Sequence, residues 1–302
     1  MLRSVDRGDD LNSALGELFA QQRATWPALI DGETALRKTP VRVLQIGDAA
    51  LVAQANVQRR ASTFAKTDAK SIASRPCFLC EDNLPGAERA VRFDRLVVMA
   101  NPFPAMDEHL TIASPDHVPQ RLDDRVLDLH YLMRALGDKR FVLYNGPRCG
   151  ASAPDHFHFQ SGATRSMPIF GHAQLDHGSD VSALRAGART AFKLRFADRD
   201  ASCAALSALL ARLPSDDGEP MVNVLAVHRD GHYVTLVFPR HKHRTAGFVP
   251  GGGGLAISPA GLEMAGLIVV SDLDQFERVD VAQVETIFEE VCWNLQQVES
   301  YL

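Results

Sequence analysis

Strict alternation of polar and aromatic residues near the middle of the chain predicts a strand with one polar face. Residues 155–160 read Asp-His-Phe-His-Phe-Gln. Because a strand has a period of two, His156, His158 and Gln160 would share one face and the two phenylalanines would enter a core on the other. The run 141–145 reads as a second strand. The Gly- and Pro-containing segment between the two strands reads as a tight loop of a size suited to phosphate.

The rest of the pattern predicts an α+β fold, because apolar positions recur at helical spacing in some segments and alternate or run continuously in others. The expected helices are 11–22, 122–136, 202–213 and a single long helix at 281–302. The expected strands are a pair within 41–57 turned at Gly47-Asp48, a pair 97–100 and 109–113 around a Pro-rich bend, a hairpin within 221–244 turned at Asp230-Gly231, and 265–271. A mobile loop is expected at the tetraglycine 251–254. We therefore expect an antiparallel sheet covered by helices.

Length and composition limit the classes of protein to which the chain can belong. A chain of 302 residues, 46% of them hydrophobic, is long enough for one large domain or two ordinary ones. Its net charge of −5 argues against a general nucleic-acid surface. There is no run of about 18 apolar residues and no apolar core near the start, so we expect a cytoplasmic protein without a membrane partner. Five cysteines, an odd number, fit a reducing compartment better than a disulfide framework.

A Cys-x-x-Cys pair is a candidate half of a metal site. Cys77 and Cys80 have the spacing that lets two thiolates bind one zinc ion. The other ligands must come from elsewhere, and His117 and His156 are available. The alternative is two unrelated buried thiols or a redox pair, which the absence of a surrounding βαβ pattern makes less attractive.

Two basic segments could face the phosphates of a nucleotide, although a solvated basic loop explains the first better and an exposed strand end explains the second equally well. The first contains Asn56, Arg59, Arg60 and Lys66, and the second runs from Arg240 to Arg244. Other polar residues near the predicted strands are also ambiguous. Asn101 and Asn145 could be turn formers, and His109 could be a core histidine.

The motifs NGPRCGAS…HFHFQ, NPFPAMDEHLTI and CFLC together resemble the transferase branch of the histidine-triad superfamily, from about residue 40 onward. That branch contains galactose-1-phosphate uridylyltransferases, diadenosine tetraphosphate phosphorylases and GDP-hexose phosphorylases. The resemblance implies a histidine-triad-like fold of two fused halves, 1–170 with the motif and 171–302. It also implies His158 as the nucleophile and a structural zinc held by Cys77, Cys80, His117 and His156.

The activity expected from this resemblance is nucleotidyl transfer. His158 would attack the α-phosphorus of a dinucleoside polyphosphate or a nucleotide sugar, and inorganic phosphate or a sugar phosphate would take the nucleotidyl group from the histidine. Gln160 and the loop residues Gly150, Ala151 and Ser152 would bind the transferred phosphoryl group. The remaining expected contacts are Asn101 and Asn145 to ribose or base, and Arg240 and Lys242 to the other phosphates. We expect no organic cofactor, and a homodimer is possible. The alternatives are a hydrolase of nucleotides and a nucleotide-binding protein without turnover.

Overall fold

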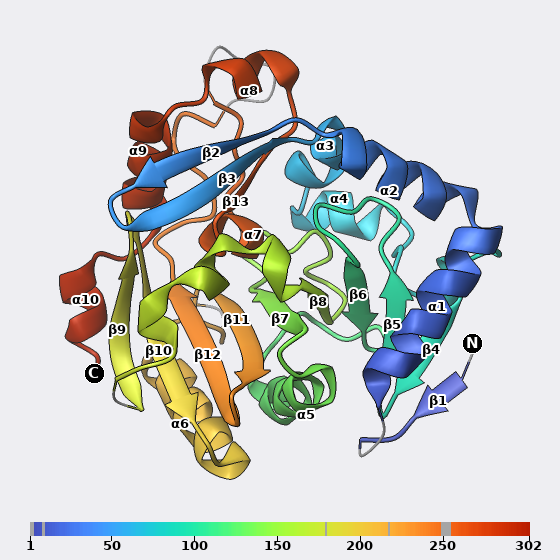
Figure 1. Cartoon of the computed structure of the whole chain (residues 1–302), viewed down its shortest axis with the longest axis horizontal. Helices are drawn as coiled ribbons and strands as arrows, with labels where there is room; N and C mark the ends of the chain where they lie inside the picture. Colours follow the sequence, from blue (N-terminus) through green and yellow to red (C-terminus); the bar gives the residue numbers. More distant parts are fainter. Residues whose placement is uncertain (1–2, 8–9, 179, 217, 249–254) are drawn as a thin grey trace.

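One long sheet forms the centre of the molecule (Figure 1). The computed structural model describes residues 3–7, 10–178, 180–216, 218–248 and 255–302, so the tetraglycine lies outside the described residues. In spatial order, the strands are β1 (Arg3–Val5), β4 (Ala90–Phe93), β5 (Leu96–Ala100), β6 (Leu110–Ala113), β8 (His158–Ala163), β7 (Arg140–Asn145), β11 (Val222–Arg229), β12 (His232–Pro239), β10 (Arg189–Phe196) and β9 (Val181–Ala186). All neighbouring pairs are antiparallel except β1 and β4, which are parallel.

A second, smaller sheet packs against the first and joins distant parts of the chain. It contains β2 (Val41–Ile46), β3 (Ala49–Ala55) and β13 (Leu267–Val270). The predicted hairpin at 41–57 is confirmed, and so is the strand predicted at 265–271. The pairing of β13 with β3 is parallel, however, and joins residues more than 200 positions apart. The division into units 1–170 and 171–302 stays a prediction.

Helices cover one face of the long sheet and the small sheet covers part of the other (Figure 1). The first core cluster contains residues of α1 (Leu11–Thr25), α2 (Pro27–Lys38), α5 (Val126–Leu136), α6 (Arg199–Arg212) and α10 (Leu295–Glu299). The second contains residues of β2, β3 and β13 with those of α7 (Gly261–Met264), α8 (Leu273–Arg278) and α9 (Val281–Val291). This is the α+β architecture predicted from the sequence, with mixed sheets in place of a purely antiparallel one.

The central strand β8 has the two faces that its alternation predicts. Phe157 and Phe159 are fully buried in the first core cluster, under the helices. His158 and Gln160 are at the intervening positions and therefore face the other way. The strand begins at His158, later than expected, because residues 153–156 form a turn closed by the bond from the His156 amide to the Ala153 carbonyl.

The helix predictions hold for three segments and fail for the last. The long helix expected at 281–302 is two helices, α9 and α10, separated at residues 292–294. Cys292 leaves the helix to form a β-bridge with Arg240, and the Trp293 amide donates to the Pro239 carbonyl. Asn294 then caps the new helix by accepting from the Gln297 amide. The prediction also missed α2, which begins at Pro27 in the position where proline suits a helix.

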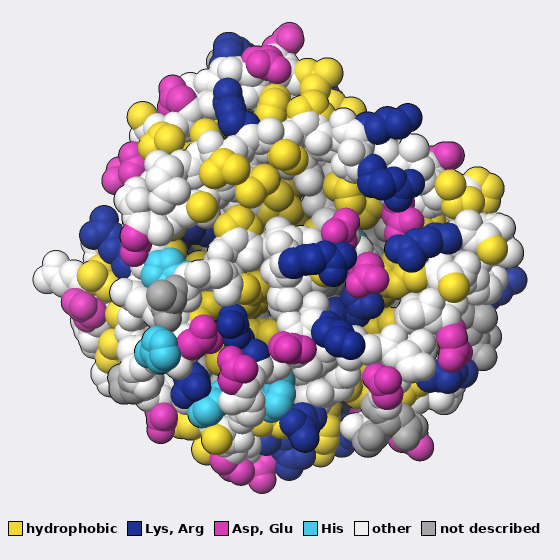
Figure 2. Space-filling view, viewed as in Figure 1, with side chains coloured by type: hydrophobic (Ala, Val, Ile, Leu, Met, Phe, Trp, Pro, Cys, Tyr) yellow, Lys and Arg dark blue, Asp and Glu magenta, His cyan; other side chains and the backbone are white. Residues whose placement is uncertain are grey.

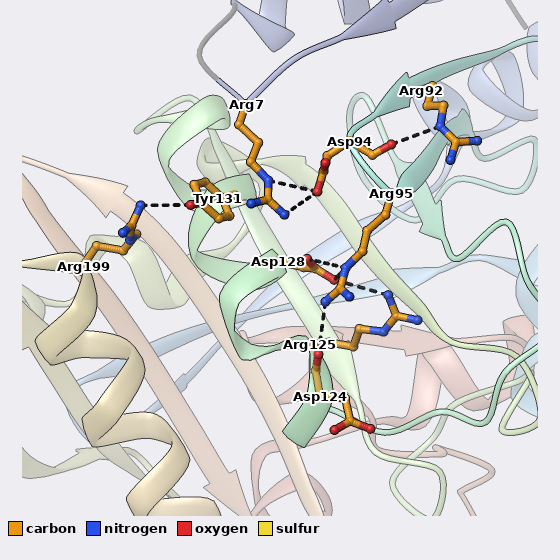
Figure 3. Close-up of polar contacts among 9 residues, drawn as sticks. All are labelled: Arg7, Arg92, Asp94, Arg95, Asp124, Arg125, Asp128, Tyr131 and Arg199. Carbon is orange, nitrogen blue, oxygen red and sulfur yellow. Dashed lines mark hydrogen bonds and ion pairs between the residues drawn. The ribbon is translucent and has the colours of Figure 1, made fainter.

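Ion pairs on the helical face attach the N-terminal segment to the sheet (Figure 3). Arg7 donates two hydrogen bonds to Asp94, at the turn between β4 and β5, and its guanidinium lies 4.0 Å from the centre of the Tyr131 ring on α5. Next to it, Arg95 donates to both carboxylate oxygens of Asp128 on α5 at 2.8 Å. These contacts join β1, the β4–β5 turn and α5, on the face of the sheet opposite His158.

The outer surface of the small sheet is apolar. Figure 2 shows hydrophobic side chains gathered over the upper part of the face where β2 and β3 lie in Figure 1. Val41 and Val43 of the edge strand β2 are 59% and 66% exposed, whereas Leu44 and Ile46 are buried. Among the described residues, no helix is long and apolar enough to cross a membrane.

A buried carboxyl group makes stability depend on pH. Glu219, before β11, accepts hydrogen bonds from the Leu122 amide and the Tyr144 hydroxyl. Burial raises the pKa of Glu219 from 4.5 to about 7. Its protonated form is therefore favoured by folding, and this stabilisation is complete below pH 4.5 and is lost as pH rises through about 7.

Removing this group changes the pH dependence in one direction: between pH 5 and pH 8 the free energy of unfolding of Glu219→Gln should change by about 2 to 3 kcal/mol more in the stabilising direction than that of the wild type. Urea denaturation of both proteins at the two pH values measures this. The same pH dependence in both proteins would contradict the assignment.

Candidate active site and metal centre

Four side chains predicted as metal ligands come together in the structure. The ligand atoms of Cys77, Cys80, His117 and His156 all lie within 4.8 Å of one another. The Cys77 Sγ atom is 3.3 Å from His156 Nδ1, and the Cys80 Sγ atom is 3.2 Å from His117 Nδ1. Zinc bonds of about 2.0 to 2.3 Å in a tetrahedron require separations of roughly this size. The residues therefore fit a zinc ion with four protein ligands.

The second nitrogen of each histidine is held in the way that zinc ligands require. His156 Nε2 donates to the Ser114 carbonyl at 2.8 Å, which leaves the Nδ1 lone pair directed at the thiols. His117 Nε2 lies 3.5 Å from the carboxylate of Asp155. Sequence reasoning had given Asp155 no role. With four protein ligands no coordination position would be left for a substrate, so a zinc ion bound here would have a structural role.

His158 is held as a neutral imidazole with a defined tautomer. Its Nδ1 donates to the carbonyl of His156 at 2.9 Å, so that Nε2 carries the lone pair. The side chain is 5% exposed, and burial lowers the pKa of His158 to about 4. Its backbone amide and carbonyl both bind the side-chain amide of Gln120, at 2.7 and 2.9 Å. These contacts fix both the ring and the strand that carries it.

Gln160 is oriented by His109, which precedes β6. The Ala105 amide donates to His109 Nδ1 at 3.2 Å, so the ring proton is on Nε2. That Nε2 donates to the Gln160 side-chain carbonyl at 2.9 Å. The amide group of Gln160 therefore keeps its NH₂ for other partners. Burial lowers the pKa of His109 to about 3, which keeps this arrangement at neutral pH.

A narrow cavity of about 50 Å³ lies beside β8 and collects several of the predicted binding residues. Its lining includes Gln160, Asn145 and the loop residues Gly150, Ala151 and Ser152. Gly150 has φ of +98°, and a Cβ atom there would be 2.4 Å from the Cβ atom of Ala260. Only glycine lets the loop approach α7 this closely.

Residues from distant segments complete the narrow cavity. Arg59 comes from the 3-10 turn Val57–Arg59 that follows β3, and His243, Arg244, Ser258 and Glu263 come from the C-terminal part of the chain. Arg244 Nε and His243 Nε2 both contact the Ser258 hydroxyl, at 2.8 and 2.9 Å. Burial raises the pKa of Glu263 to about 7, and both of its oxygens accept backbone amides. The two guanidinium groups make this cavity suitable for an anion.

A larger cavity of about 660 Å³ adjoins the narrow one, because Arg59, Ser62, Ala65 and Ser152 line both. Phe78 and Phe103, 48% and 57% exposed, contribute aromatic surface to its wall, which is largely apolar. Its polar lining residues include Asn101, Gln58, Lys66 and Arg75. Cavities of this volume, apolar with a few polar groups, are typical binding sites for small molecules.

The structure does not bring Arg240 and Lys242 to either cavity. The Arg240 side chain is buried and donates to the Asn223 side chain and to the carbonyls of Val291, Lys242, His243 and Pro259. Lys242 pairs with Glu290 at 2.7 Å. Phosphate contacts expected for these two residues do not fit this placement. Of the earlier basic segment, Arg59 and Lys66 line a cavity, whereas Arg60 points to solvent and Asp272.

Sequence reasoning missed several lining residues. Phe78 lies between the two cysteines of the predicted metal motif, and Phe103 lies in the Pro-rich bend, so both were in segments already singled out. Ser258 and Glu263 gave no local signal, because long-range contacts such as the pairing of β13 with β3 and the bond from the Gly261 amide to Asn145 bring their segment to the site.

Comparisons with known proteins agree with the fold. A family model described as a domain of unknown function, DUF4922, matches residues 18–163. No curated protein matches the chain. Three solved structures of yeast Ap4A phosphorylase Apa2 resemble it at 17 to 18% identity. The first covers 88% of this chain and 93% of the other with a TM-score of 0.54. The complex with AMP covers 92% and 94% with a TM-score of 0.60, and the complex with Ap4A covers 91% and 97% with a TM-score of 0.58.

These likenesses define the class of fold. The chain has the histidine-triad-like fold that its sequence motifs predicted. Over most of its length the chain is similar in fold to the yeast Ap4A phosphorylase.

We propose that the four-residue cluster binds one structural zinc ion per chain. Elemental analysis of the purified protein should give about one zinc per chain, and Cys77→Ser should lose the metal and lower the melting temperature. Cys203→Ser, on α6 and remote from the cluster, is the matched control and should keep both. A stable protein with intact thiols and no bound metal would rule the zinc out.

Proposed function

We propose that the chain is a nucleotidyltransferase of the phosphorylase type that works through a nucleotidyl-histidine intermediate on His158. The observation that carries the proposal is the neutral His158 ring, fixed through Nδ1 and placed on the same face of β8 as the cavity residue Gln160. The likeness to an Ap4A phosphorylase solved with AMP and with Ap4A supports a nucleotide substrate.

The larger cavity suits a nucleoside. Its volume of about 660 Å³ exceeds the needs of a phosphate group, and Phe78 and Phe103 offer aromatic surface on which a base could stack. Asn101 is held in place by its bonds to Thr111 and the Phe103 amide and can meet ribose or base. Arg59, at the junction of the two cavities, would then meet the phosphates next to the nucleoside.

In the first step the lone pair of His158 Nε2 forms a bond to the α-phosphorus, and the bond from that phosphorus to the bridging oxygen breaks. The leaving group is a phosphate that departs as an anion. In the second step an oxygen of the acceptor phosphate attacks the same phosphorus, the P–N bond breaks, and His158 returns to its neutral form. Alignment and charge neutralisation carry this chemistry, because phosphoryl transfer makes few covalent demands on the protein.

Gln160 favours transfer over hydrolysis. Since His109 occupies its carbonyl, the group that Gln160 can offer to a phosphoryl oxygen is its NH₂. That group donates hydrogen bonds and cannot take a proton from water, so the intermediate should wait for an acceptor that is already an anion. The narrow cavity with Arg59, Arg244 and His243 is the place we assign to that acceptor.

The covalent intermediate can be trapped. Incubation with Ap4A, ATP or GDP-sugar labelled at the α-phosphorus, followed by quenching in base, should leave label on the wild type and none on His158→Ala. Turnover should fall about 10³-fold or more, because the nucleophile is removed. A wild type that binds these nucleotides and never becomes labelled would contradict the mechanism.

Substitutions of Arg59 and of its neighbour Arg60 can serve as a test and its matched control. Arg59→Met should raise the dissociation constant for AMP about 10- to 100-fold, because a charge-assisted contact to phosphate contributes roughly 1.5 to 3 kcal/mol. Arg60→Met should leave it unchanged, because Arg60 is exposed and only 3.8 Å from Asp272. Calorimetric titration of both variants measures this, and equal effects would argue against the phosphate role of Arg59.

A further inference from the structure

The segment Arg75–Cys80 contributes to the metal cluster and to the larger cavity at once. Cys77 and Cys80 lie in the cluster, while Arg75 and Phe78 line the cavity. The guanidinium of Arg75 lies 5.1 Å from the centre of the Phe78 ring, so these two side chains form one continuous piece of wall. A single short segment therefore belongs to two sites.

Asp155 connects the same two sites from the other side. One carboxylate oxygen lies 3.5 Å from Nε2 of the metal-ligand candidate His117, and the other accepts from Arg75 at 3.0 Å. Arg75 also donates to the carbonyl of Ser152, which lines both cavities. The Arg75 Nη1 atom is buried and has no hydrogen-bond partner among the described residues, so one donor of this wall is left for a ligand.

The segment has little regular structure to hold it without the metal. The short helix Ala69–Ala73 ends before Arg75 and a short 3-10 turn follows at Glu81–Asn83, and the cysteines lie between these two elements. Its apolar support is the smallest of the three core clusters, which includes Leu79, Met99 and Ala153. Bonds to a metal would therefore add ordering to a wall that is otherwise held by the contacts of Arg75 to Asp155 and Ser152.

We propose that metal binding and nucleotide binding are coupled in this protein, through the Arg75–Phe78 wall, with Asp155 as the positioning residue that links them. The inference rests on the proposed nucleotide function and on the proposed zinc. A bound metal orders the wall before the nucleotide arrives, so the nucleotide binds without the entropic cost of ordering it. Coupling between two sites is reciprocal, so the nucleotide must tighten the metal by the same factor.

The experiment measures both directions with AMP and zinc as probes. Titration of AMP into zinc-loaded and chelator-treated wild type should give an affinity about 10-fold or more higher with zinc, within the usual range of such coupling. Transfer of zinc to a coloured chelator should give a zinc affinity that rises by the same factor when AMP is present. This second measurement does not require a stable metal-free protein.

Three variants locate the coupling. Phe78→Ala keeps all four ligands but should reduce AMP affinity mainly in the zinc-loaded protein and remove most of the effect of AMP on zinc. Phe103→Ala is the matched control, because Phe103 lines the same cavity from the bend between β5 and β6. It should reduce AMP affinity equally with and without zinc. Asp155→Ala should weaken zinc about 10- to 100-fold, as loss of a partner of a metal-bound histidine commonly does, and should also lower the coupling factor.

The results of these experiments distinguish a failure of the coupling from a failure of the proposed function. AMP bound equally well with and without zinc, or the same loss of coupling in Phe78→Ala and Phe103→Ala, would overturn the coupling and leave the nucleotide function standing. Zinc-loaded wild type that binds no AMP would overturn the proposed function and the coupling with it.

Discussion

The bond from His158 Nδ1 to the carbonyl of His156 is the contact on which the site depends. It decides which ring nitrogen has a lone pair, and therefore whether the ring can attack phosphorus at all. The accepting carbonyl belongs to a residue whose own ring lies in the thiol and imidazole cluster. The tautomer of the proposed nucleophile is thus set by the backbone of a metal-ligand candidate two residues earlier, and Gln120 holds the backbone of His158 itself by two further hydrogen bonds. The ring of His158 is placed by hydrogen bonds to uncharged neighbours, and not by a charged partner.

The site also requires that the loop between β7 and β8 keeps its conformation. A buried chain of polar contacts does this from the C-terminal part of the protein. Arg240 donates to Asn223, and Asn223 donates both to Asn145 and to the carbonyl of Cys149 in the loop. An isolated buried guanidinium would be costly, but Arg240 has five acceptors. Because Asn223 lies on β11 and Arg240 directly follows β12, the loop conformation depends on a hairpin that lies far along the chain from it.

The local contacts around His158 and the long-range contacts around Arg240 explain how much of the molecule could be predicted from the sequence. Period-two alternation around residues 155–160 was enough to separate Phe157 and Phe159 from His158 and Gln160, since strand geometry is local. The hairpin turns at Gly47 and Gly231 were equally local. The break before Asn294 was not, because Cys292 leaves its helix to meet Arg240, a contact that helical periodicity cannot express. The expectation that Arg240 contacts phosphates has the same origin. The sequence shows that the side chain is basic, but it does not show the buried carbonyl groups that accept its hydrogen bonds.

The size difference between the two cavities bears on what kind of reaction the site can perform. Their volumes are about 50 and 660 Å³, and they meet at Arg59 and Ser152. A hydrolase needs room for one nucleotide and free access for water. A transferase needs a second, restricted position in which an anion is held in line with the first. The narrow cavity is walled by Arg59, Arg244 and Gln160 and closed by the approach of Gly150 to Ala260, which leaves space for a small anion and little else. Cations in the narrow cavity would also offset the repulsion between an anionic acceptor and the negatively charged nucleotidyl group. A water molecule is neutral and needs no such compensation.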